Sequence, residues 1–151
     1  MYSRLHNDNI GSVSSGTMRP EDLIPAFLWE LEHQSKLLKG HKGLIEEINT
    51  RMESDEYYET EDADYDLEAL FDALNEYCMP YFYFGAHPGD GADFGYWLCE
   101  DFKYNFDGLK VDDLSDIPTG YTGEVLQVND HGNMTLYYCS LGRLYEIWSI
   151  V

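Results

Sequence analysis

Eleven acidic residues lie between Glu53 and Glu76, and no Lys, Arg or His interrupts them. Carboxylates this dense can bind a cation, contact a basic protein surface, or face solvent. Glu68, Asp72 and Glu76 recur every fourth residue, which places them on one flank of a helix, where like charges repel each other. Because no basic residue relieves this repulsion, the spacing favours a contact surface over a solvated one. The eleven acids are Glu53, Asp55, Glu56, Glu59, Glu61, Asp62, Asp64, Asp66, Glu68, Asp72 and Glu76.

Three tyrosines, Tyr57, Tyr58 and Tyr65, are interleaved with these acids. Tyrosine is enriched among the residues that dominate binding energy at protein interfaces. A folded surface that carries carboxylates at a spacing comparable to that of DNA phosphates could occupy the groove of a DNA-binding protein. We therefore expect these tyrosines and the eleven acids to form a partner-binding surface. The alternative is a flexible acidic loop that confers solubility.

A second candidate site is the Gly-rich segment from Gly85 to Asp93. Its Ala-His-Pro-x-Asp sequence resembles the metal-binding motif of zinc-dependent sugar deacetylases, but Gly89 replaces the first Asp of that motif. An independent metal site would form if this loop met the later Asn-Asp-His-Gly-Asn turn at one end of a sheet. Short polar residues and Gly also suit tight turns for backbone reasons alone. The candidate ligands are His87, Asp90, Asp93, Asp130 and His131.

The composition is that of a folded acidic protein. The 151 residues include 29 Asp and Glu and 9 Lys and Arg, which gives a formal net charge of −20. This charge repels a phosphate backbone and excludes conventional nucleic-acid binding. The 15% aromatic content is too high for a disordered acidic tail. Without a signal-type or membrane-spanning apolar stretch, the sequence predicts a soluble protein of the cytoplasm, and its three cysteines predict no disulfide framework.

The first half of the chain is predicted to be helical. Pro20 and the two acids after it suit a first helical turn, and apolar residues follow at near-helical spacing as far as Leu38. Gly40 is expected to end this helix. The sequence predicts a second short helix over residues 44–52, and the apolar stripe of residues 66–78 predicts a third.

The second half is predicted to form strands, of which the last three make an antiparallel meander. The predicted strands are residues 81–84, 94–99, 124–128, 134–139 and 144–150. Helices followed by strands predict an α+β fold, with two to three N-terminal helices packed on a four- to five-stranded antiparallel sheet. Residues 1–16 are expected to be a mobile arm, and residues 17–151 a single domain.

Four long strings extend through the chain: GTMRPEDLIPAFLWELE, FDALNEY, YFYFGAHPGDGADFGYW and EVLQVNDHGNMTLY. Together they resemble a family of small acidic proteins of tailed phages and prophages, over roughly residues 16–151. The resemblance supplies no catalytic or binding residues, but it implies a role in host takeover or in overcoming host defence. In composition alone, the acidic stretch also resembles the DNA-mimic inhibitors of restriction and CRISPR systems.

We therefore expect a non-enzymatic inhibitor, without a cofactor, that binds a basic, nucleic-acid-binding host protein in the cytoplasm of the host cell. We expect the protein to be a monomer or a homodimer. The alternatives are a metal-dependent enzyme that uses the His87 loop and a non-catalytic phage structural or assembly protein. Because the acidic segment lacks apolar periodicity, we also expect the fold to tolerate neutralisation of Glu59, Glu61, Asp62, Asp64 and Asp66.

Overall fold

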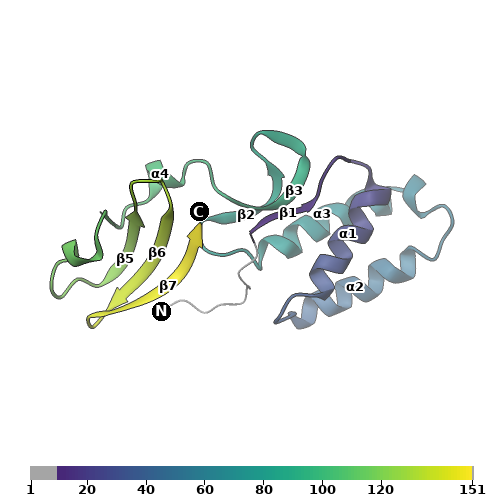
Figure 1. Ribbon diagram of the computed structural model, residues 1–151. Helices are drawn as coiled ribbons and strands as arrows, with labels where there is room; N and C mark the ends of the chain where they lie inside the picture. Colours follow the sequence, from purple (N-terminus) through teal and green to yellow (C-terminus); the bar gives the residue numbers. More distant parts are fainter. Residues whose placement is uncertain (1–9, 151) are drawn as a thin grey trace. The chain divides into compact units, whose positions relative to one another are not determined.

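The structure, a computed structural model, describes residues 10–150 of the chain (Figure 1). These residues group into two compact units that meet in the sequence between Glu100 and Asp101. The N-terminal unit holds the described residues up to Glu100, and the C-terminal unit holds those from Asp101 onward. The sequence had predicted one continuous domain over residues 17–151, whereas each unit has its own sheet.

Helices α1 (Pro20–Glu32) and α2 (Lys39–Arg51) occupy the region predicted to be helical, with a different boundary between them. Pro20 starts α1, where its missing N–H is not needed, and two acids in the first turn face the positive end of the helix. The helix ends at Glu32, before the predicted Leu38. Gly40, which was expected to stop a helix, lies in the first turn of α2, where glycine costs less than in a helix interior.

Helix α3 (Glu61–Asn75) begins earlier than its apolar pattern predicted. The residue before it, Thr60, is extended, and the short 3-10 helix η1 (Tyr57–Glu59) precedes that. Three acids, Glu61, Asp62 and Asp64, lie in the first turn, where the positive end of the helix dipole favours negative charge. Six of the eleven acids therefore lie in α3, although the first turn of this helix lacks the apolar stripe that predicted its later part.

The sheet of the N-terminal unit has the order β1-β3-β2, and both strand pairs are antiparallel. Strands β2 (Phe82–His87) and β3 (Asp90–Leu98) form a hairpin that takes in most of the segment predicted to be a Gly-rich loop, so that only Pro88 and Gly89 lie between them. Strand β1 (Gly11–Ser14) lies in the segment predicted to be a mobile arm. The first nine residues of that predicted arm lie outside the described residues.

Gly95 explains how β1 packs so closely on β3. A Cβ atom at Gly95 would overlap the backbone carbonyl of Gly11, its neighbour on β1. Only glycine leaves room for this approach. The polar composition of residues 11–14 therefore did not predict a strand, because β1 depends on its partner β3, far away in the sequence.

An aromatic cluster joins the helices to the sheet of the N-terminal unit. The ring of Phe27 on α1 lies 5.1 Å from Phe71 on α3 and 5.1 Å from Phe84 on β2, in edge-to-face arrangements. Phe94 on β3 completes the group at 6.0 Å from Phe27. Such pairs add to the free energy gained from burial, and they fix α1 and α3 against the strands.

The outer edge of β2 is closed by a side chain. The amide of Asn75, the last residue of α3, accepts a hydrogen bond from the backbone N–H of Phe84 at 2.9 Å and donates one to its carbonyl at 3.1 Å. It thus replaces the neighbouring strand that an edge strand lacks. Exposed strand edges are sites of aggregation, so this contact also protects the sheet.

The C-terminal unit contains a four-stranded sheet of order β4-β5-β6-β7. Its meander matches the prediction: β5 (Gly123–Val128), β6 (Met134–Ser140) and β7 (Arg143–Ile150) are antiparallel. Strand β4 (Leu109–Val111) was not predicted and pairs in parallel with β5. The short helices α4 (Phe102–Asn105) and η2 (Leu114–Asp116) flank β4 in the sequence. The α+β class is confirmed, but two sheets replace the single antiparallel one.

None of the helices in the described part of the chain combines the length and the apolar character needed to cross a membrane.

Candidate functional site

Six exposed acids cover one face of α3 and its C-cap. At 3.6 residues per turn, they fall within an arc of about 160° around the helix axis. The buried residues of α3, among them Leu70 and Leu74, lie on the opposite side. We call this surface the acidic face, and it consists of Glu61, Asp62, Asp64, Glu68, Asp72 and Glu76.

Tyr65 projects from the middle of the acidic face. By the same helical geometry its direction is close to the centre of the acidic arc. Its side chain is 64% exposed. The acidic face therefore combines carboxylates with one amphipathic ring that can contact a partner.

The charge density of the acidic face is close to that of one DNA strand. From Glu61 to Glu76 the helix rises about 23 Å, so six carboxylates give about one charge per 4 Å of axis. A single strand of duplex DNA carries one charge per about 3.4 Å of axis. The match is one of mean density, because Asp64, Glu68, Asp72 and Glu76 recur only about every 6 Å of axis and the other two acids are crowded at the start of the helix.

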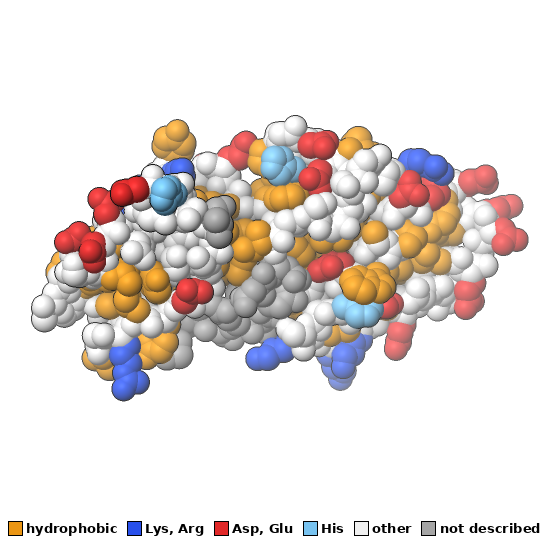
Figure 2. Space-filling view, viewed as in Figure 1, with side chains coloured by type: hydrophobic (Ala, Val, Ile, Leu, Met, Phe, Trp, Pro, Cys, Tyr) orange, Lys and Arg blue, Asp and Glu red, His pale blue; other side chains and the backbone are white. Residues whose placement is uncertain are grey.

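The segment between α2 and α3 extends this negative surface. Glu53, Asp55, Glu56 and Glu59 are all exposed, as the sequence predicted. Figure 2 shows acidic side chains gathered at the right-hand end of the view, where the segment from α2 to α3 turns in Figure 1. Among the described residues, the ion pairs of this region are those of Asp66 and Glu76.

Asp66 does not belong to the binding surface that the sequence predicted. It is only 5% exposed, and Arg51 binds it through two hydrogen bonds, Nε to Oδ2 at 2.9 Å and a terminal nitrogen to Oδ1 at 2.6 Å. The hydroxyl of Tyr57 donates a third, at 2.8 Å. The acidic run itself contains no basic residue, but Arg51, the last residue of α2, is the counter-ion of Asp66.

Tyr57 and Tyr58 are also less available than predicted. Tyr57 is 2% exposed, and its ring lies edge-on to Tyr58, which is half-buried. Burial, reinforced by the hydrogen bond to Asp66, raises the pKa of Tyr57 above its ordinary value. Of the three interleaved tyrosines, Tyr65 alone is largely exposed.

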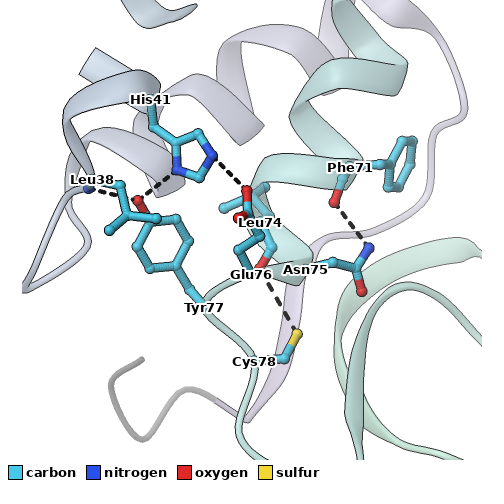
Figure 3. Close-up of polar contacts among 8 residues, drawn as sticks. All are labelled: Leu38, His41, Phe71, Leu74, Asn75, Glu76, Tyr77 and Cys78. Carbon is cyan, nitrogen blue, oxygen red and sulfur yellow. Dashed lines mark hydrogen bonds and ion pairs between the residues drawn. The ribbon is translucent and has the colours of Figure 1, made fainter. Parts of the chain in front are cut away.

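Glu76 has a structural contact as well as an exposed carboxylate. His41 on α2 lies with Nε2 2.7 Å from Glu76 Oε2 and with Nδ1 2.7 Å from the hydroxyl of Tyr77 (Figure 3). That hydroxyl also accepts the backbone N–H of Leu38 at 2.9 Å. A chain of Tyr, His and Glu can relay protons, but Tyr77 is 1% exposed and its phenol is closed to a substrate. The cluster fastens the start of α2 to the end of α3.

Three of the five predicted metal ligands have other contacts, and the remaining two lie in a different unit. His87 Nδ1 accepts the backbone N–H of Gly89, and Asp90 accepts that of Ala92, so both side chains order the hairpin turn. Asp93 accepts a hydrogen bond from the Ser12 hydroxyl on β1. Asp130 and His131 lie in the other unit, in the turn between β5 and β6. Across residues 10–150, no three His, Cys, Asp or Glu side chains form a group suited to a metal ion.

Comparison with known proteins adds no further constraint, because no protein-family model, curated protein or solved structure matches the chain.

Proposed function

We propose that the acidic face binds the basic, nucleic-acid-binding surface of a partner protein and competes there with DNA. The observation that carries the proposal is the acidic face of α3, whose mean charge per length of axis is close to that of a DNA strand, with Tyr65 exposed near its centre. The resemblance to phage proteins makes a host defence nuclease or CRISPR component the partner to test first.

The charge distribution supports this choice of partner. Residues 4–100 hold 21 of the 29 acids but six of the nine basic residues. Of those six, Arg51 is engaged by Asp66 and Arg19 by Glu21. The resulting field attracts basic surfaces and increases the rate of encounter with them.

Repulsion within the acidic face lowers the stability of α3, and a solvated surface gains nothing in return. Asp64, Glu68, Asp72 and Glu76 stand at successive four-residue intervals, and each such like-charged pair costs about 0.2–0.5 kcal/mol. Lysine at position 68 or 72 would turn this repulsion into attraction. A solvated face would thus be better served by mixed charges.

Tyr65 supplies what charge alone does not. Exposed ion pairs contribute little binding energy each, whereas a tyrosine buried on association can contribute a large share of the total. A ring within the acidic arc can pack against the aliphatic parts of Lys and Arg side chains while the carboxylates pair with their charged ends.

Affinity capture from a bacterial lysate, with the chain immobilised through its C-terminus, tests this proposal. The wild type is compared with a variant that carries Asp64→Asn, Glu68→Gln and Asp72→Asn. The matched control carries Asp107→Asn, Asp112→Asn and Asp116→Asn, which removes the same charge from exposed positions of the C-terminal unit.

We expect the wild type and the control to retain the same DNA- or RNA-binding protein, which added duplex DNA elutes. The α3 variant should lose it. Equal retention by both variants, or a retained protein that DNA does not elute, would contradict the proposal.

A further inference from the structure

The tip of the β6–β7 hairpin carries a pocket that is separate from the acidic face. Tyr138 pairs directly with Tyr145 across the two strands, and Ser140 pairs with Arg143. Alternate residues of a strand point to the same side, so these two pairs share one face of the sheet. Together with Leu141 in the turn, they line an open pocket of about 410 Å³, a size typical of small-ligand sites.

Arg143 gives this pocket a positive charge that no other described residue neutralises. Acids outnumber basic residues 29 to 9 in the chain, yet within residues 10–150 no ion pair or hydrogen bond engages the Arg143 side chain. A guanidinium presents a planar set of donors that matches a carboxylate or a phosphate. The hydroxyl of Ser140, its cross-strand neighbour, is a second donor.

Leu141 lines the pocket at a cost to the hairpin. Leu141 and Gly142 form its two-residue turn with positive φ values of 53° and 75°, the arrangement that favours Asn or Gly at both positions. A leucine there is strained, and this one is also 95% exposed. Neither property helps the unit to fold.

We propose that this pocket binds an anion attached to a planar ring, the chemistry shared by nucleoside monophosphates, aryl phosphates and aryl carboxylates. Arg143 and Ser140 bind the anion. The rings of Tyr138 and Tyr145 stack against the planar group, and Leu141 covers its edge. The proposal does not depend on the acidic face, so either one can fail alone.

Titration of the full chain, isotope-labelled for NMR, tests the proposal with five probes at an ionic strength that screens the net charge. Phenyl phosphate, benzoate and adenosine monophosphate carry both the ring and the anion, whereas inorganic phosphate and phenol each carry one part. We expect the first three to shift the signals of Leu141 and Arg143 saturably, and the two partial probes to bind at least about tenfold more weakly. The order of phenyl phosphate and benzoate tells whether the site prefers phosphate or carboxylate.

Variants distinguish binding at this pocket from a general effect of the protein's net charge. Arg143→Gln should weaken phenyl phosphate binding at least about tenfold, whereas Lys103→Gln, which removes a charge elsewhere in the same unit, should not. Leu141→Asn should raise the melting temperature, because Asn suits the turn, and should weaken binding. The signal dispersion of each variant reports its fold.

Three results would overturn the proposal. The first is the absence of saturable shifts with any ring-bearing anion, and the second is equal weakening by Arg143→Gln and Lys103→Gln. The third is equal affinity for inorganic phosphate and phenyl phosphate, which would indicate an adventitious ion only.

Discussion

Asp66 of α3 is held by Arg51 of α2 in a two-point ion pair, in the middle of a run of exposed acids. The remaining lone pairs of the carboxylate are partly used by Tyr57, so the group is well satisfied although it is buried. Asp66, like Glu76 through His41, thus links α3 to α2, whereas exposed acids between them such as Glu68 and Asp72 can meet a partner.

Asp66→Asn should destabilise the protein, in contrast to the expectation drawn from the sequence. The Asn amide cannot accept through both of its terminal atoms, so the buried site loses hydrogen bonds from Arg51 or Tyr57 together with the ion pair, and we expect the free energy of unfolding to fall by about 2 kcal/mol. Asp64→Asn is the matched control and should change it by no more than about 0.5 kcal/mol. Urea unfolding measures both, and equal effects of the two substitutions would refute the structural role of Asp66.

Alkaline pH should destabilise the protein through Tyr57. Because its pKa is raised in the folded state, the folded protein retains this proton longer than the unfolded chain does. The stabilising contribution is complete below about pH 10, the ordinary tyrosine pKa, and is lost as the pH rises toward the folded value, by about 1.4 kcal/mol per pH unit. Tyr57→Phe should reduce the slope of unfolding free energy against pH above pH 10 by this amount. Tyr104→Phe, at a position that is 90% exposed, should leave the slope unchanged; the same slope in both variants would exclude Tyr57 as the source.

The sequence predicted those elements whose apolar periodicity and turns are local. The three strands of the C-terminal meander alternate regularly and are separated by short turns, and their boundaries were predicted to within a residue or two. Strands β1 and β4 were missed because each is short and owes its conformation to pairing with a strand distant in sequence. Such pairing leaves no local pattern.

The acidic face was predicted only in part, because part of it depends on local spacing and part on a residue of another helix. Exposure of Glu68, Asp72 and Glu76 followed from their spacing relative to the apolar stripe of α3. The burial of Asp66 depends on Arg51, which lies on another helix, and sequence spacing alone does not show which acid a distant cation will meet. The sequence did offer one signal for this pair, because Arg51 lies in the last turn of α2, just before the acidic run.

Gly95→Ala should detach β1 from the sheet of the N-terminal unit. The new methyl group would overlap the Gly11 carbonyl, so we expect faster amide hydrogen exchange at residues 11–14 and a lower melting temperature. Gly91→Ala is the control, because a Cβ atom there meets no other atom within 4 Å. Unchanged exchange at residues 11–14 in Gly95→Ala would mean that β1 does not need this close approach.

Asn75→Ala should expose the edge of β2. It removes the amide that pairs with both backbone groups of Phe84, and we expect a loss of about 1–3 kcal/mol in unfolding free energy, with a greater tendency to aggregate. Asn49→Ala, an exposed position on α2, is the matched control. Light scattering and urea unfolding measure the two effects. A stability loss no larger than that of the control would show that the pairing is dispensable.

The central claim is that the acidic face occupies a site for DNA, and displacement of labelled DNA tests it most directly. A fluorescent duplex is bound to the captured partner, and its anisotropy is followed as the chain is added at increasing concentrations and at several salt concentrations. We predict that the wild type releases the duplex, less effectively as salt rises. The variant with Asp64→Asn, Glu68→Gln and Asp72→Asn should remain folded and require at least about tenfold more protein for the same release. Equal displacement by this variant and the wild type would contradict the claim.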